Sequence, residues 1–285
     1  VCGLCIPDLG QLALLNDKAA LAQLAQRLGI AVPRSFSPEL GESVAHFAAR
    51  APLPCVVKPL CGEAFGLSAA QRYVIARTPQ ALEEAYTRFF ALTNSAPVVQ
   101  EYLPGAALGC SILAQDGRVV ASIAHRRVRE YPVTGGPSSC CRVADETPLL
   151  RAVCALVRET GFSGVAMFEF KCGQDGAPRL LECNPRVWGT YPLTRAAGTN
   201  FSYLWCCAAL GEPLPDYIRP RPVKMTYQPA DLAAMLGYLL RGKIARALGV
   251  LGSLLDPRVK NGLFEWRDAA PGLRYFAGLF RRARR

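Results

Sequence analysis

The chain lacks most of the features that assign a protein to a class directly. Its longest run without a charged residue, Ala196 to Gly211, is shorter than a membrane-spanning helix requires and contains Thr, Asn and Ser. No signal-peptide pattern, internal repeat or low-complexity tract is present. The net charge is +11, yet no zinc finger, RNA-binding aromatic signature or helix-turn-helix accompanies it. Nucleic acid is therefore the least favoured polyanionic partner.

The composition indicates a globular protein with free cysteines. The chain has 285 residues, of which 51% are hydrophobic and 19% charged, enough for about two lobes. The twelve cysteines lie largely in predicted strands and helices, which favours free thiols in a reducing cytoplasm over a disulfide scaffold. Cys2 and Cys5 form one C-x-x-C pair, but no second pair completes a zinc site.

Helical and strand patterns alternate along the chain, and hairpins outnumber strand–helix–strand crossovers. The turns Asp116-Gly117 and Asp175-Gly176 each join two apolar runs, as in β-hairpins. This pattern predicts an α+β protein with antiparallel sheets. A first helix is predicted within 15–30, where Asn16 or Asp17 can cap its start and Gly29 ends it. Further predicted helices cover about 79–92, 147–161, 193–210 and 231–255, and predicted strands cover 54–60, 72–76, 96–103, 110–115, 118–128, 164–171 and 178–184.

A group of polar residues at the end of one hairpin points to metal and phosphate chemistry. Glu169 lies in an apolar strand, and the partner strand ends in Glu182 and Asn184. Neighbouring strands are about 4.8 Å apart, so the two carboxylates can share one face, where they repel unless a proton or cation lies between them. Oxygen donors of this kind suit Mg²⁺ or Mn²⁺. Arg186 adds a donor fork for a phosphoryl or carboxylate group, while Cys183 is expected to point away.

Two further stretches suit phosphates and a base. Lys58 lies in the apolar strand "CVVKPL", where an unpaired ammonium is costly and a phosphate would offset the cost. The loop after it contains Gly62 and Gly66, whose backbone amides could cover phosphates. The run "VVQEYLPG" offers backbone hydrogen-bonding groups beside apolar walls.

In chain order, the segments "LNDK", "VVKP", the glycine loop, "QEYLPG", "FEFK" and "LECNPR" resemble the ATP-grasp superfamily over about residues 12–211. The carbamoyl-phosphate-synthase and biotin-carboxylase-like branch is the most similar. The resemblance implies ATP held between two α+β lobes with antiparallel sheets. The implied phosphate-binding residues are Lys18 and Lys58, the implied adenine hinge is Glu101, Tyr102 and Leu103, and the implied metal ligands are Glu169, Glu182 and Asn184.

The resemblance implies further roles and an activity. Arg186 would bind an acyl phosphate or a substrate carboxylate, and Arg127 would reach the phosphates. His125 either approaches the ribose or phosphates or is a hydrogen-bonded core histidine, and both alternatives stay open. The implied reaction is ATP- and Mg²⁺-dependent activation of a carboxylate for attack by an amine or another nucleophile. The alternatives are a catalytically impaired nucleotide-binding regulatory module and a basic protein that binds membranes or polyanions.

The expected organisation is an ATP-grasp domain at 1–212, with lobes at about 12–105 and 106–212, and a linker with a basic helical extension at 213–285. The chain does not begin with Met, and we expect upstream sequence and the family's N-terminal domain to be missing. Expected partners are small-molecule substrates, with a homodimer left open.

The stretch Arg129 to Cys140 is either a mobile loop at the acceptor site or an exposed connection. Leu236, Leu239 and Leu240 beside basic residues are expected to pack on their own domain rather than on a membrane, and Arg77 is expected on the surface.

Overall fold

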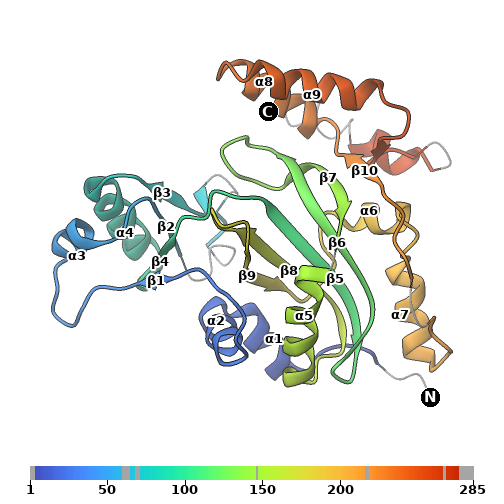
Figure 1. Ribbon diagram of the computed structural model, residues 1–285, viewed down its shortest axis with the longest axis horizontal. Coiled ribbons are helices and arrows are strands. Elements are labelled where there is room, and N and C mark those ends of the chain that lie inside the picture. Colours follow the sequence, from blue (N-terminus) through green and yellow to red (C-terminus); the bar gives the residue numbers. More distant parts are fainter. Residues whose placement is uncertain are drawn as a thin grey trace.

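The computed structural model describes residues 4–59, 65–67, 71–145, 147–215, 218–265 and 268–275, and Figure 1 shows a small lobe beside a larger one. In the described part of the small lobe, four antiparallel strands form a sheet in the order β1-β4-β2-β3. Two helices pack on this sheet and contribute Phe47, Leu82 and Phe89 to its core. The bounds are β1 (Ser35–Phe36), α3 (Val44–Arg50), β2 (Cys55–Lys58), β3 (Val74–Ala76), α4 (Pro79–Thr93) and β4 (Val98–Glu101).

The larger lobe is built on a sheet that has seven strands within the described residues, in the order β11-β10-β7-β6-β5-β8-β9. Its pairs are antiparallel except β10 with β11. The bounds are β5 (Ala107–Gln115), β6 (Arg118–Glu130), β7 (Ser138–Ala144), β8 (Gly164–Cys172), β9 (Pro178–Asn184), β10 (Lys224–Thr226) and β11 (Lys260–Asn261). The predicted α+β class with antiparallel sheets is confirmed.

Each face of the large sheet carries its own hydrophobic core. On one face, α1 (Leu9–Asn16), α2 (Lys18–Arg27) and α5 (Thr147–Thr160) pack on strand residues such as Ile112 and Phe168. On the other face, α7 (Phe201–Leu210) packs on residues such as Leu113 and Ile123. Because side chains alternate along a strand, consecutive residues of β5 enter different cores.

Several predicted boundaries are corrected by the structure. The helix predicted within 15–30 is α2, which is capped by Asp17 as one of the two predicted alternatives and is followed by Gly29 at φ +70°. The preceding helix α1 was not predicted. The single helix expected at 193–210 is two helices, α6 (Tyr191–Ala196) and α7, separated by Gly198 at φ +98°. The end of the expected loop at 129–140 belongs to β7, which leaves residues 131–137 as the connection.

The C-terminal extension is not separate from the second sheet. β10 pairs with β7 through Lys224, Met225 and Thr226, so the sheet continues past the linker that begins at 213. The helix expected at 231–255 is a hairpin of α8 (Ala230–Leu239) and α9 (Ile244–Leu255). In Figure 1 this hairpin lies at the end of the molecule beyond β7, far from α1 and α2.

Candidate functional site

Three of the predicted ligands meet on one side of the β8–β9 hairpin. Glu169 of β8 and Glu182 of β9 are direct cross-strand partners. Asn184, two residues further along β9, places its Nδ2 3.3 Å from Glu182 Oε1 and 3.5 Å from Glu169 Oε1. The side chains of Glu169 and Glu182 are 17% and 31% exposed, so both remain accessible to a ligand. The register that leaves the Asp175-Gly176 turn pairs Phe170 with Leu180. A shift of one residue in β9 then brings Glu182, instead of Leu181, opposite Glu169.

Cations from other elements surround these carboxylates. Lys18, the first residue of α2, places Nζ 3.1 Å from Glu182 Oε2. Arg127 of β6 donates from Nη2 to Glu169 Oε2 at 2.6 Å. Its Nη1 lies 3.7 Å from Glu130 Oε1, a carboxylate that the sequence did not point to. We call the set Lys18, Lys58, Arg127, Glu169, Glu182 and Asn184 the charged cluster.

Lys58 brings the small lobe into the charged cluster. Burial and, to a smaller extent, the charge of Lys18 lower the pKa of its ammonium to about 8, against the opposing effect of Glu182 and Glu169. All three of these charges belong to the larger lobe or to α2, so the side chain of Lys58 faces them across the gap between the lobes. In the ligand-free protein its charge is therefore only partly compensated.

The two carboxylates have opposite pKa shifts. Burial raises the pKa of Glu169, and the charge of Glu182 raises it further against the opposing effect of Arg127. Burial also acts against ionisation of Glu182, but Lys18 and Lys58 outweigh it and lower the pKa of Glu182. The pair is thus coupled, and a divalent cation between the oxygens would remove the repulsion that raises the pKa of Glu169.

The oxygen donors of Glu169, Glu182 and Asn184 match part of the coordination shell of a hard divalent cation. Two carboxylates and one amide supply oxygen ligands, the kind that Mg²⁺ and Mn²⁺ prefer, and phosphate oxygens would have to complete the shell. No group of three or more His, Cys, Asp or Glu side chains arranged for a metal occurs among the described residues. The predicted site is therefore an open one that requires a phosphate ligand in addition to the protein.

Arg186 and the predicted hinge lie near their expected places. Arg186 donates from Nη2 to Asn184 Oδ1 at 3.2 Å, which joins it to the charged cluster. At the end of β4, the carboxylate of Glu101 accepts from Arg34 Nε at 2.9 Å, so this side chain forms an ion pair at the lobe surface. Leu103 is buried. Any adenine contact at 101–103 would then come from the backbone and apolar groups.

Arg77 lies near the predicted hinge, and Gly66 belongs to the predicted glycine loop. Arg77 is exposed, as expected, and its guanidinium lies 5.8 Å from the centre of the Tyr102 ring. Gly66 has φ +66° and is exposed, whereas Gly62 lies outside the described residues.

His125 occupies the position of a core histidine. It is 2% exposed, and its Nε2 lies 3.3 Å from the hydroxyl of Thr190. Burial and, to a smaller extent, Arg127 lower its pKa to about 3, so the ring is neutral at physiological pH. Its cross-strand neighbour has to be Gly109, because a Cβ there would lie 2.3 Å from the ring. This packing favours the core alternative over direct contact with phosphates.

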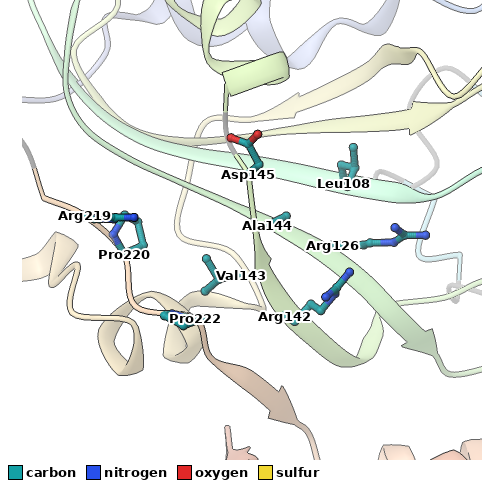
Figure 2. A pocket seen from close by; sticks show the side chains of 9 residues that line it. All are labelled: Leu108, Arg126, Arg142, Val143, Ala144, Asp145, Arg219, Pro220 and Pro222. Carbon is teal, nitrogen blue, oxygen red and sulfur yellow. The ribbon is translucent and has the colours of Figure 1, made fainter.

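A hollow of about 560 Å³ lies away from the charged cluster (Figure 2). Its floor includes Arg126, which precedes Arg127 on β6 and therefore faces the other side of the sheet. Arg126 and Arg142 are cross-strand partners in this floor, and Asp145 lies at the rim, where it caps α5 through Thr147. None of the predicted site residues lines this hollow.

Comparisons with known proteins agree with this geometry. Residues 94–231 match the family model described as ATP-grasp in the biosynthetic pathway with Ter operon. The resemblance to the ATP-grasp superfamily is confirmed. Carnosine synthase 1 from Gallus gallus is 31% identical over 164 residues, which are 54% of this chain and 18% of that protein. The carbamoyl phosphate synthase large chain of Deinococcus deserti is 28% identical over 197 residues, 64% of this chain and 18% of that protein.

Solved structures share the fold at low sequence identity. The biotin carboxylase domain of Hydrogenobacter thermophilus 2-oxoglutarate carboxylase, in complex with MgADP, has a TM-score of 0.60 and 18% identity over 76% of this chain and 50% of that one. An L-amino acid ligase from Bacillus licheniformis has a TM-score of 0.56 and 19% identity over 75% of this chain and 53% of that one. The predicted ATP-grasp fold is confirmed. The chain spans about a fifth of the length of the two curated relatives and about half of these structures.

Proposed function

We propose that this chain is the nucleotide-binding part of an ATP- and Mg²⁺-dependent ligase that joins a carboxylate to an amine or another nucleophile. The observation that carries the proposal is the charged cluster, in which two coupled carboxylates and an amide lie beside three cations from three separate elements. The presence of ligases of this kind among the similar proteins supports it.

In the proposed reaction, the γ-phosphoryl group of ATP moves to a carboxylate oxygen of the substrate, which gives ADP and an acyl phosphate. The nucleophile then attacks the acyl carbon, and inorganic phosphate leaves. Mg²⁺ or Mn²⁺ at Glu169, Glu182 and Asn184 would supply charge neutralisation for the transferred group. The positioned cations of the chain serve the same end, because phosphoryl transfer depends mainly on positioning and electrostatics.

The individual cations would divide this work. Lys18 is held by Glu182 at 3.1 Å, so nucleotide binding would exchange that carboxylate for a phosphate oxygen. Lys58 would gain its main anionic partner in the same step. Arg127 would stay paired with Glu169 while facing the phosphates, and Arg186 would receive the acyl phosphate or the substrate carboxylate.

The proposed site also includes an adenine hinge, a phosphate-covering loop and a border of the acceptor site. The backbone at 101–103 would form the adenine hinge, and the loop with Gly62 and Gly66 would cover the phosphates. Residues 131–137 would border the acceptor site, since Tyr73 of the small lobe donates from its hydroxyl to Thr134 O at 3.2 Å and joins the two lobes there. A cytoplasmic location, where ATP and reduced thiols are available, and a homodimer are further parts of this proposal.

Glu182→Gln provides the test, because it removes one charge at nearly constant volume. With Mg²⁺ present, turnover of ATP with a panel of carboxylic acids and hydroxylamine as the trapping amine should fall by orders of magnitude. The variant should fold as the parent does. The matched control is Glu84→Gln on the exposed side of α4, which should keep full activity. A Glu182→Gln protein that is less stable but fully active would contradict the assignment and leave Glu182 as a partner of Lys18 only.

A second candidate is a nucleotide-binding regulatory module that does not turn over. The residues after the hinge, Ala106 to Leu108, offer no acid to hold a ribose, which many members of the superfamily have. This alternative predicts Mg²⁺-dependent nucleotide binding without ADP release for any carboxylate in the panel. The same experiment therefore separates the two candidates.

A further inference from the structure

The two C-terminal helices bury their small and polar residues and expose their large apolar ones. The buried residues of α8 are Asp231, Ala234 and Tyr238, and those of α9 are Ala247, Val250 and Ser253. The expectation that Leu236, Leu239 and Leu240 pack on their own domain is wrong, because Leu236 is 58% and Leu240 78% exposed. A solvent-facing helix of a globular domain normally has the opposite arrangement.

The exposed apolar side chains of α8, α9 and the turn between them make up what we call the outer face. Ile244, Leu248, Leu251 and Leu255 follow the i, i+4, i+7 spacing of a single helical stripe on α9. A hollow of about 240 Å³, lined by Leu236 and Leu240 together with Tyr131 and other residues of the 131–137 connection, opens beside α8. The outer face consists of Leu232, Leu236, Leu239, Leu240, Ile244, Leu248, Leu251, Leu254 and Leu255.

A buried ion pair holds the helical hairpin in this orientation. The guanidinium of Arg129 on β6 donates to both carboxylate oxygens of Asp231, at 2.8 and 2.6 Å, and the two side chains are 6% and 0% exposed. Arg129 also donates to Ser253 Oγ at 3.0 Å and to Gly249 O at 3.2 Å on α9. A rotation that turned the leucines inward would expose this hydrogen-bond network to water. The leucines that became buried have no polar group that could replace it.

The charges along the outer face are basic, apart from Asp256 at the end of α9, whose carboxylate pairs with Arg258 at 2.9 Å. Between residues 230 and 255 the only acidic residue is Asp231, which is buried and paired, whereas Arg241, Lys243 and Arg246 are exposed. In a twofold contact with a second copy, these cations would lie near their own counterparts, which disfavours that occupant. An apolar surface with a basic border is instead complementary to an anionic lipid headgroup layer over acyl chains.

We propose that the outer face binds the surface of an anionic membrane. The leucines of α8 and α9 enter the boundary between headgroups and acyl chains, and Arg241 and Lys243 contact the headgroups. The attachment is peripheral, since no helix in the described ranges has the length and apolarity to cross a bilayer. The proposal does not depend on the proposed ligase activity, because none of its residues belongs to the charged cluster.

Vesicle flotation of the whole chain tests this. The protein should float with vesicles of phosphatidylcholine mixed with phosphatidylglycerol and bind poorly to phosphatidylcholine alone. Arg241→Glu/Lys243→Glu should lower the partition coefficient by more than about tenfold, since each basic residue near an anionic surface contributes about 1 kcal/mol. Arg246 is left in place because it stacks on the buried Tyr238. Leu248→Asp/Leu251→Asp should abolish flotation.

The controls carry the same substitutions elsewhere on the surface. Leu40→Asp on the small lobe and Arg118→Glu at the β5–β6 turn replace exposed side chains and should leave flotation unchanged. Near-ultraviolet circular dichroism checks that each variant is folded. Equal flotation with neutral vesicles, flotation that survives both outer-face variants, or no flotation at all would overturn the proposal. A dimer in light scattering that Leu248→Asp/Leu251→Asp dissociates would also overturn it, in favour of a second copy as the occupant.

Discussion

The charge on Lys58 should make the ligand-free protein less stable than it would be with an apolar side chain at that position. In the folded protein the pKa of Lys58 is about 8, compared with 10.5 for an ordinary lysine. At about 1.36 kcal/mol per pH unit, the difference corresponds to about 3 kcal/mol of unfavourable free energy when the ammonium is charged. A site that binds phosphate would keep such a residue in spite of its cost.

Lys58→Met should therefore stabilise the ligand-free protein at pH 7 by up to about 3 kcal/mol while nucleotide binding is lost. The difference between the two proteins should depend on pH in one direction. Because the unfolded chain retains the proton on Lys58 up to its ordinary pKa, the wild type binds more protons unfolded than folded between about pH 8 and 10.5. Its stability relative to Lys58→Met should therefore rise across this interval and level off above it.

The assay is urea unfolding of both proteins at several pH values, with the difference in free energy of unfolding plotted against pH. Taking the difference cancels the other groups that titrate in this range. Lys260→Met, at an exposed position of β11, is the control and should give a flat difference. A Lys58→Met protein that is less stable than wild type at pH 7 would refute the reasoning, since Lys58 would then stabilise the fold through Glu182 and Glu169.

Three other predictions follow from the described contacts. Asp231→Ala should lower the free energy of unfolding by about 3–5 kcal/mol, because it leaves Arg129 buried without its carboxylate. The double variant Arg129→Met/Asp231→Leu should recover most of that loss in the same urea assay. Cys183→Ala should lower the free energy of unfolding by about 1 kcal/mol and leave Mg²⁺-dependent nucleotide binding unchanged, since Cys183 is buried in the core on the other side of β9. A folded variant that has lost nucleotide binding would contradict this. Titration calorimetry should detect ATP binding with Mg²⁺ and much weaker binding with a chelator, because Glu169 and Glu182 repel the triphosphate. Equal affinities under the two conditions would argue against a metal at these carboxylates.

The hairpin that carries the carboxylates could be predicted because its Asp175-Gly176 turn is a local signal, and strand alternation places Cys183 on the opposite side of β9 from Glu182. The shift of one residue that brings Glu182, instead of Leu181, opposite Glu169 is not specified by the turn. The meeting of these residues with Lys58 joins segments more than a hundred positions apart, which no local pattern specifies. Only the resemblance to a known superfamily connected them before the structure did.

Strand β7 was missed because local signals pointed to a loop. The segment of β7 contains small residues and adjacent cysteines after Gly135, Gly136 and Pro137, a combination that indicates a loop. Its strand conformation comes from pairing with β6 on one side and β10 on the other. The composition of a segment carries no information about which distant strands will pair with it.

The helical tail illustrates a different limit of periodicity. The spacing of leucines in α8 and α9 defines an apolar stripe correctly, but it cannot say which stripe of the helix faces the domain. Here that choice is made by Asp231, whose partner Arg129 lies 102 positions earlier in the sequence. The ion pair lies on the domain side of α8 and α9, and the leucines lie on the side that faces solvent.

Strand β6 connects the charged cluster with this helical hairpin. Arg127 pairs with Cys141 and Arg129 with the adjacent Cys140, so the ladder skips Val128. Consecutive residues of β7 face opposite sides of the sheet, and the bulge therefore sends two arginines that are only two positions apart to opposite faces. One binds Glu169 and the other binds Asp231. Without the bulge both guanidinium groups would lie on the same face, and either Glu169 or the buried Asp231 would be left without its arginine.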